Sequence, residues 1–261
     1  MRKIKLGSIE LEIKKLDQAG IDDARALVYD AYVNERKWEI NEQYPYEVKT
    51  NHQGKKMMVN KYDDLAMCTW FGVYHKQKLI ACVRITERLN GLLELEKGAN
   101  SSELLQKTSQ YPNILEIGRT IVHKDYRSAG IYALLVKIGL EECYKRKISA
   151  CGCSSAERSL QFLNMLAKHF PDGTIIRGVT YSNDIDPDEN AIFIVDYEKG
   201  HVAGVINLIN KRLGLSTVHN SQDQLKQTTT NTPAFWSSNN TSEIESQSTK
   251  TTSTLNPKPK L

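Results

Sequence analysis

Two charged side chains that could perform acid–base chemistry lie three residues apart in the apolar segment Leu115-Glu116-Ile117-Gly118-Arg119. The segment is typical of a β-strand, in which Glu116 and Arg119 would face opposite sides of the sheet. Gly118 permits a β-bulge, which would bring both side chains to one side and leave a backbone N–H unpaired. That N–H could stabilise an oxyanion, Glu116 could accept a proton from an attacking amine, and Arg119 could hold a carboxylate. The alternative is a buried ion pair that joins the sheet to a helix.

A candidate phosphate site follows where this strand ends, in His123-Lys124-Asp125-Tyr126-Arg127-Ser128-Ala129-Gly130-Ile131. The first N–H groups of the helix that begins here lack partners within the helix, and the helix dipole is positive at this end. Ser128 can cap the helix, and Ala129 and Gly130 are small enough for a phosphate to approach the backbone as far as Ile131. Arg127 adds a charge-assisted donor. An ordinary helix cap beside a surface arginine is the alternative interpretation.

Four further residues are candidates for binding a second substrate. Arg84 could bind a carboxylate or a phosphate, or it could be an exposed strand arginine. Asp63 could hold an amine or orient Arg84, and it is equally suited to cap a helix. Tyr32 and Trp38 could shape a substrate pocket, although aromatic residues at helical spacing more often belong to the core.

Alternating strands and helices must position these residues. Apolar patterns predict strands over 9–14, 69–74, 79–86, 114–122, 148–153, 174–181 and 192–197. Apolar residues at helical spacing predict helices over 21–38, 129–144, 156–170 and 201–213. We expect the stretch 39–64 to be irregular. This order predicts an α/β fold in which one central mixed β-sheet carries helices on both faces.

The composition is that of an ordinary globular protein. The chain has 261 residues, of which 40% are hydrophobic and 25% charged. The net charge of +4 does not require a nucleic-acid partner, and we expect none. From residue 216 onward Ser, Thr, Asn and Gln dominate. We therefore predict one domain over 1–215 and a disordered low-complexity tail over 216–261.

The first residues and the cysteines bear on the compartment. The stretch MRKIKLGSIELEIKK lacks a continuous apolar run, so we expect no secretory signal and a cytoplasmic location. The predicted helix over 201–213 could touch a membrane surface, but packing on the sheet is the simpler expectation. We expect the cysteines to be reduced and mostly buried, and we predict neither a metal site nor a permanently bound cofactor.

The turn at Arg127 resembles motif A of the GNAT acyltransferase superfamily, Arg/Gln-x-x-Gly-x-Gly/Ala. Arg127 and Gly130 match this motif, whereas Tyr132 replaces its second glycine. The order of the predicted elements is also similar to that fold. The resemblance implies that backbone amides of the loop hold the phosphate groups of an acyl thioester. Tyr132 leaves less room for a coenzyme A pyrophosphate, which suits an acyl carrier protein with its single phosphate.

Four shorter elements resemble those of acyl-homoserine-lactone synthases, and long-chain N-acyl amino acid synthases share the same skeleton. They are an aromatic-x5-Trp element at 32–38, a Tyr-Asp element at 62–63, a Gly-x-x-Arg-Leu-like strand at 81–85 and Glu-x-x-Arg at 116–119. Asn60 and Val28 stand where the lactone synthases carry an acidic residue that contacts S-adenosylmethionine and an arginine. These departures favour an amino acid or a similar small amine as the acceptor.

The resemblance implies an N-acyltransferase that moves a long-chain acyl group from an acyl carrier protein or acyl-CoA thioester to a small amine by direct attack. Glu116 would be the base, and Tyr181 could protonate the leaving thiolate, as a tyrosine does in many relatives. Arg84, Asp63, Trp38 and Tyr32 would contact the acceptor. Two alternatives stay open. One is a short-chain, CoA-dependent N-acetyltransferase, and the other is a non-catalytic GNAT-fold binding module.

Overall fold

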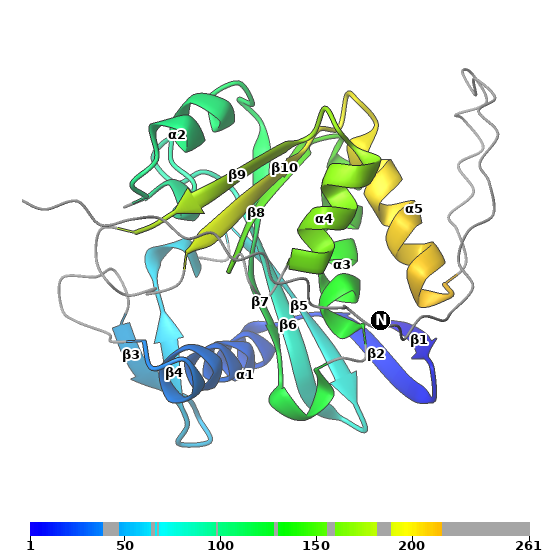
Figure 1. Cartoon of the computed structure of the whole chain (residues 1–261). Helices are drawn as coiled ribbons and strands as arrows, with labels where there is room; N and C mark the ends of the chain where they lie inside the picture. Colours follow the sequence, from blue (N-terminus) through cyan, green and yellow to red (C-terminus); the bar gives the residue numbers. More distant parts are fainter. Residues whose placement is uncertain are drawn as a thin grey trace, which may run out of the picture. The chain divides into compact units, whose positions relative to one another are not determined.

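An eight-stranded sheet with the strand order β1-β2-β5-β6-β7-β8-β10-β9 forms the centre of the molecule (Figure 1). This computed structural model describes residues 1–38, 47–63, 66, 68–97, 99–127, 130–155, 160–181 and 189–215. They belong to one compact unit, Met1–Val218. The strands of the sheet are β1 Arg2–Leu6, β2 Ile9–Lys15, β5 Cys68–His75, β6 Lys78–Thr86, β7 Ile114–Val122, β8 Ser149–Ser155, β9 Thr174–Val179 and β10 Asn190–Val195.

The sheet is mixed, as the sequence predicts. From β1 to β7 each neighbouring pair is antiparallel, and so are the pairs β8–β10 and β10–β9. Strands β7 and β8 are parallel, and the helix α3 (Ile131–Arg146) connects them. A parallel pair needs such a crossover because the chain must return to the same end of the sheet.

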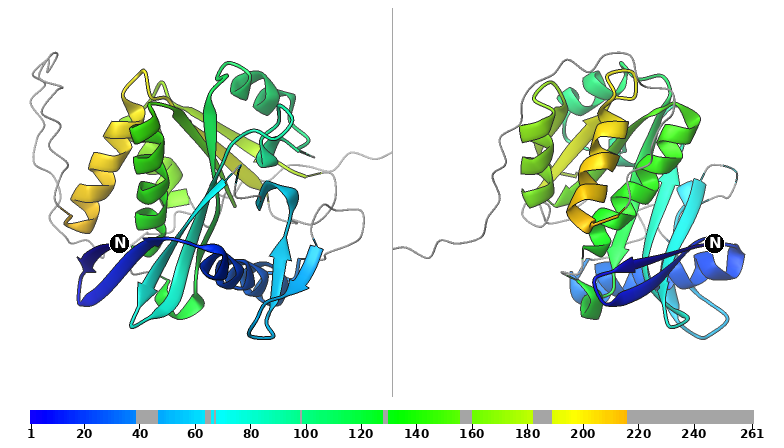
Figure 2. Two further views of the ribbon diagram at one scale, coloured as in Figure 1. Left: turned by 180° about the vertical axis from the view of Figure 1, so that it is seen from behind. Right: turned by 90° about the vertical axis from the view of Figure 1, so that its right-hand side faces the viewer.

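Helices cover both faces of the sheet, which confirms the predicted fold class (Figures 1 and 2). On one face, α3, α4 (Leu160–His169) and α5 (His201–Leu213) bury a large apolar cluster that includes Leu134, Leu163 and Val205. On the other face, α1 (Gln18–Tyr29) buries Ile21 and Val28 against Trp70. Within the described residues, no helix is long and apolar enough to cross a membrane.

A second apolar cluster on the α1 face lies over β8, β9 and β10. It joins Leu93 and Leu95 to Leu104 of the short helix α2 (Ser102–Thr108), and these residues pack on Ile192 and Ile194. A turn of 3-10 helix, η3 (Glu94–Glu96), precedes α2 and carries Glu94 between the buried Leu93 and Leu95, followed by Glu96. The packing of these leucines holds η3 against the sheet, next to the central strands.

Strands β7 and β8 pair over only part of their length. Their register runs from Ile114 opposite Ser149 to Ile117 opposite Gly152, after which β7 continues to Val122 and β8 to Ser155 (Figure 1). The two halves of the sheet therefore part just beyond Ile117. The candidate residues Gly118 and Arg119 lie at this point of separation.

Several elements differ from the sequence prediction. Strand β1, the hairpin of β3 (Glu47–Thr50) and β4 (Lys56–Val59), and helix α2 were not predicted. They are short and mostly exposed or polar, so they lack the apolar periodicity on which the prediction depends. The predicted helix over 21–38 ends as an α-helix at Tyr29 and continues as a π-helical segment, η1 (Asp30–Glu35). The predicted tail, and with it the boundary at 215, lies outside the described residues.

Candidate active site

Strand β7 contains the bulge that the sequence predicts. The register between β6 and β7 shifts between Cys82 and Arg84. As a result, Val83 faces two residues of β7, Arg119 and Thr120. Arg119 has a φ of +50°, in the left-handed region that costs a non-glycine residue about 1–3 kcal/mol. The bulge turns Arg119 toward the same side of the sheet as Glu116, where η3 lies.

Gly118 contributes space to the bulge rather than a left-handed backbone. The residue of the bulge with a positive φ is its neighbour Arg119, and the φ of Gly118 is not positive. A Cβ on Gly118 would lie 3.1 Å from Glu116 Oε1 and 3.8 Å from Arg84 Nη2. The missing side chain therefore leaves room for a carboxylate and a guanidinium that come from two neighbouring strands.

Glu116 is buried and hydrogen-bonded. Its Oε2 accepts a hydrogen bond of 3.0 Å from the backbone N–H of Leu95 in η3. Burial raises the pKa of the Glu116 carboxyl above its ordinary value, although Arg84, the Leu95 N–H and Arg119 act in the opposite direction. A carboxylate with a raised pKa is a stronger base than an ordinary glutamate. Its environment thus suits proton abstraction.

Arg84 is completely buried, so the alternative of an exposed strand arginine is wrong. Its Nη1 donates to Asp63 Oδ1 at 2.6 Å, and its Cζ lies 5.8 Å from the ring centroid of Trp70. Asp63 also accepts a 2.9 Å hydrogen bond from the backbone N–H of Asn60 at its Oδ2. Arg25 of α1 donates to the Asp63 carbonyl at 3.0 Å. Asp63 thus both orients Arg84 and caps the short 3-10 helix η2 (Lys61–Asp63), which are two of the roles considered for it.

Glu94 of η3 joins the two candidate arginines. Its Oε2 pairs with Arg84, and its Oε1 accepts from Arg119 Nη2 at 2.5 Å. The side chain of Asn60 donates to the same Oε1 at 2.5 Å. Sequence reasoning missed Glu94. The signal that could have found it is the alternation of leucine and glutamate over 93–96, which puts Glu94 between two buried leucines.

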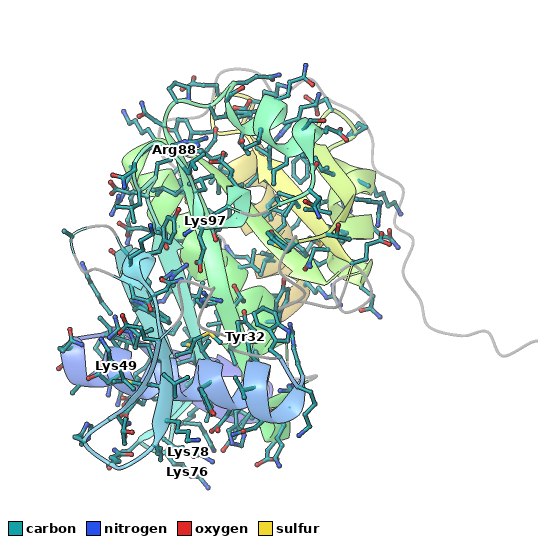
Figure 3. The ribbon with its side chains drawn as sticks, turned by 90° about the vertical axis from the view of Figure 1, so that its left-hand side faces the viewer. Tyr32, Lys49, Lys76, Lys78, Arg88 and Lys97 are labelled. Carbon is teal, nitrogen blue, oxygen red and sulfur yellow. The ribbon has the colours of Figure 1, made fainter. Side chains whose placement is uncertain are left out.

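Tyr32 and Trp38 lie beside this ionic cluster. Their rings stack with centroids 4.1 Å apart, and Arg119 Cζ lies 5.5 Å from the Tyr32 ring centroid. Tyr32 belongs to η1, which continues α1, and Figure 3 shows it below the segment that carries Lys97. The structure thus brings an aromatic pair next to one of the two arginines that could hold an acceptor.

The predicted phosphate turn is described only in part. Ser128 and Ala129 lie outside the described residues, and α3 begins at Ile131 rather than at 129. Gly130 precedes it with a φ of +76°, and a Cβ there would lie 2.7 Å from Leu213 Cδ2. Arg127 donates from Nε to the Val122 carbonyl at 3.1 Å. The left-handed backbone thus favours glycine at position 130, and a side chain there would also have to displace the end of the Leu213 side chain of α5.

Arg127 also pairs with Glu35 of η1, at 2.5 Å from Nη2 to Oε2. Both side chains are partly exposed, so the pair lies at the surface. The segment η1 therefore contacts both parts of the candidate site. Its Tyr32 meets Arg119, and its Glu35 meets the arginine of the phosphate turn.

Tyr181 lies close to the same η3 peptide that holds Glu116. Its hydroxyl donates to the Leu95 carbonyl at 3.2 Å and lies 3.6 Å from Cys153 Sγ.

All five cysteines are free thiols and four of them are buried, which confirms the prediction. Burial raises the pKa of Cys82 and of Cys143 to about 12. In the described part of the chain, no three His, Cys, Asp or Glu side chains are grouped as metal ligands.

The fold agrees with that of known acyltransferases. The structure of FeeM, an N-acyl amino acid synthase from uncultured soil microbes, is similar over 78% of this chain and 99% of that one, with a TM-score of 0.56 and 12% identity. MesI, a CoA-dependent acyl-homoserine lactone synthase, matches 79% of this chain and 97% of its own, with a TM-score of 0.50 and 13% identity. The protein thus has the GNAT-like acyltransferase fold.

The family profile of the N-acyl amino acid synthase FeeM matches residues 23–169. The chain therefore belongs to the FeeM family of N-acyl amino acid synthases, which confirms the resemblance drawn from the motifs. A comparison with curated proteins gives no significant match. The matched range contains η1, Arg84, η3, β7 and α3, so it covers the candidate site apart from Tyr181.

Proposed function

We propose that this protein transfers a long-chain acyl group from an acyl carrier protein or acyl-CoA thioester to the amine of an amino acid. The observation that carries the proposal is Glu116. It is a buried carboxyl with a raised pKa, lies just before the point where β7 and β8 part, and shares its side of the sheet with Arg84 and Arg119. Family membership supports the reaction class.

The acyl donor would approach through the turn before α3. Arg127 and the first backbone N–H groups of α3, starting at Ile131, would hold its phosphate. To do so, Arg127 has to exchange its contact with Glu35 for the phosphate. The thioester carbonyl would then lie beside the bulge at Arg119, where a backbone N–H could stabilise the oxyanion.

The acceptor amine would attack this carbonyl directly. Glu116, in its ionised form, would take the proton that the amine loses, either in contact or through one water molecule. Collapse of the tetrahedral intermediate forms the amide bond and breaks the C–S bond. The departing thiolate needs a proton, which the Tyr181 hydroxyl, now donating to the Leu95 carbonyl, would supply. The arginines and Tyr32 would position the acceptor, and positioning supplies much of the rate.

The test is expression of the intact chain in a bacterium, with mass spectrometry of lipid extracts and a Glu116→Gln variant as control. The expected product has the mass of a fatty acid plus an amino acid less water, and the variant lacks it. This product would identify donor chain and acceptor together. Extracts that are identical, from folded wild-type and variant proteins, would contradict the proposal and favour a short-chain acetyltransferase or a binding module.

A further inference from the structure

The acceptor side of the site already holds a carboxylate of the protein itself. Among the described residues, Glu94 accepts from the guanidiniums of Arg84 and Arg119 and from the amide of Asn60. Two guanidinium groups that hold one planar carboxylate could equally hold the α-carboxylate of a free amino acid. We propose that Glu94 is a displaceable counter-ion, which the α-carboxylate of the acceptor replaces when it binds. This inference rests on the proposed function, because it names what the acceptor must carry.

The burial of the three charged groups shows which of them can move. The side chain of Arg84 has no exposed surface, that of Arg119 is 9% exposed, and that of Glu94 is 13% exposed. The two arginines come from β6 and β7 in the middle of the sheet, whereas Glu94 comes from a three-residue turn. Glu94 is thus the most exposed of these three charged side chains.

The backbone of η3 does not have to move with the Glu94 side chain. The Leu95 N–H is held by Glu116 and the Leu95 carbonyl by Tyr181. Glu96, the next acidic residue, accepts from the Leu93 N–H at 2.7 Å and pairs with Arg88. With the turn fixed on both sides of residue 94, rotation of one side chain is enough to open the position between the arginines.

The charge balance of the cluster determines which acceptors can replace the Glu94 side chain. When Glu94 leaves, Arg84 keeps Asp63 as a partner at 2.6 Å, but its Nη2 and the Nη2 of Arg119 lose their carboxylate. An acceptor carboxylate restores the charge balance in a poorly solvated site, whereas a neutral amide does not. The exchange therefore selects amines that carry a carboxylate, namely free amino acids, over amino acid amides or simple amines.

Glu94→Gln tests this exchange, with the free amino acids and their α-carboxamides as paired acceptors. A neutral amide competes more weakly for the two guanidiniums, so KM for the amino acid is expected to fall by about 3–10-fold while kcat stays within about twofold. KM for the carboxamide is expected to stay unchanged. Glu87→Gln is the matched control, because Glu87 pairs with Arg146 at the surface and both kinetic constants should stay at wild-type values.

A KM for the amino acid that rises or stays constant in folded Glu94→Gln would overturn the inference and make Glu94 a fixed structural partner. If Glu94→Gln does not fold, Glu94→Asp keeps the charge but shortens the reach between the arginines, and the same selective fall in KM is expected. Calorimetric titration of the amino acids without any donor separates this inference from the proposed function. Tighter binding of the amino acid to Glu94→Gln upholds the exchange even if no acyl transfer is found, and unchanged binding alongside active transfer rejects the exchange alone.

Discussion

The backbone N–H of Leu95 donates a hydrogen bond of 3.0 Å to the buried carboxylate of Glu116. The two residues are far apart in the chain, and Leu95 comes from η3 rather than from the sheet. The hydrogen bond opposes the rise in pKa that burial causes, but burial is the larger effect and the pKa stays above the ordinary glutamate value. A base with this pKa, oriented by an element outside the sheet, has direct consequences for rate and stability.

The first prediction concerns the rate. Glu116→Gln keeps the shape of the side chain and an acceptor for the Leu95 N–H, but it removes the base, so kcat should fall by about 10²–10⁴-fold. In the wild-type protein, kcat should rise with pH through an apparent pKa above that of an ordinary glutamate, because the ionised form is the active one. The measurement is a pH–rate profile. A variant with the wild-type rate would exclude Glu116 as the base.

The second prediction concerns stability and has a definite sign. Because the pKa of Glu116 is raised in the folded state, the contribution of this carboxyl to stability is fully present below the ordinary glutamate pKa and is lost as pH rises through the raised value. Glu116→Gln has no such ionisation. The free energy of unfolding of the variant, relative to wild type, should therefore increase over this pH window. Denaturant titrations at several pH values measure it, and a difference that does not change with pH would show that the carboxyl is not desolvated.

The third prediction compares two glycines that precede helices with nearly the same backbone. Gly130 and Gly200 have φ values of +76° and +75°, but a Cβ on Gly130 would lie 2.7 Å from Leu213 Cδ2, whereas one on Gly200 meets nothing within 4 Å. Gly200→Ala should cost about 1–2 kcal/mol through backbone strain alone. Gly130→Ala should cost more, and Leu213→Ala should recover the excess. Equal losses of unfolding free energy at the two positions would show that the Leu213 side chain moves aside without destabilising the protein.

The fourth prediction concerns the buried arginine. Arg84→Met removes the cation that Asp63 and Glu94 share inside the protein, so that each of these two carboxylates loses its contact with Arg84. The expected loss is about 3–5 kcal/mol of unfolding free energy, measured by denaturant titration. A loss below about 1 kcal/mol would mean that the two carboxylates find other partners or solvent.

The fifth prediction uses the exposed arginine as a contrast. The side chains of Arg127 and Glu35 are 46% and 33% exposed, so Arg127→Met should cost less than about 1 kcal/mol in stability. If Arg127 binds the donor phosphate, the variant should instead raise KM for the acyl thioester and leave KM for the acceptor unchanged. Steady-state kinetics with each substrate varied in turn make the measurement. An increase confined to the acceptor would assign Arg127 to the other half of the site.

Much of the fold could be predicted from local patterns. Strand β7 and helix α5 have the bounds that the apolar periodicity predicts, Ile114–Val122 and His201–Leu213. The hairpin of β5 and β6 was predicted within a residue or two at each end. Each of these elements packs against the core, so its buried residues recur with the period of a strand or a helix. The π-helical turn η1 was not predictable, because its residues keep the helical spacing while the hydrogen-bonding pattern changes.

For the site, the residue types near the reaction were evident from the sequence, but their partners were not. Glu116, Gly118 and Arg119 stand out because charged residues and a glycine interrupt an apolar strand, and that pattern is local. The arginine pairing through Glu94 joins β6, β7 and a turn, and the burial that raises the pKa of Glu116 comes from packing of η3 on the sheet. Contacts of this kind depend on how separate segments meet in space. No spacing along the chain encodes them, because desolvation and charge pairing are properties of the folded surroundings of a side chain.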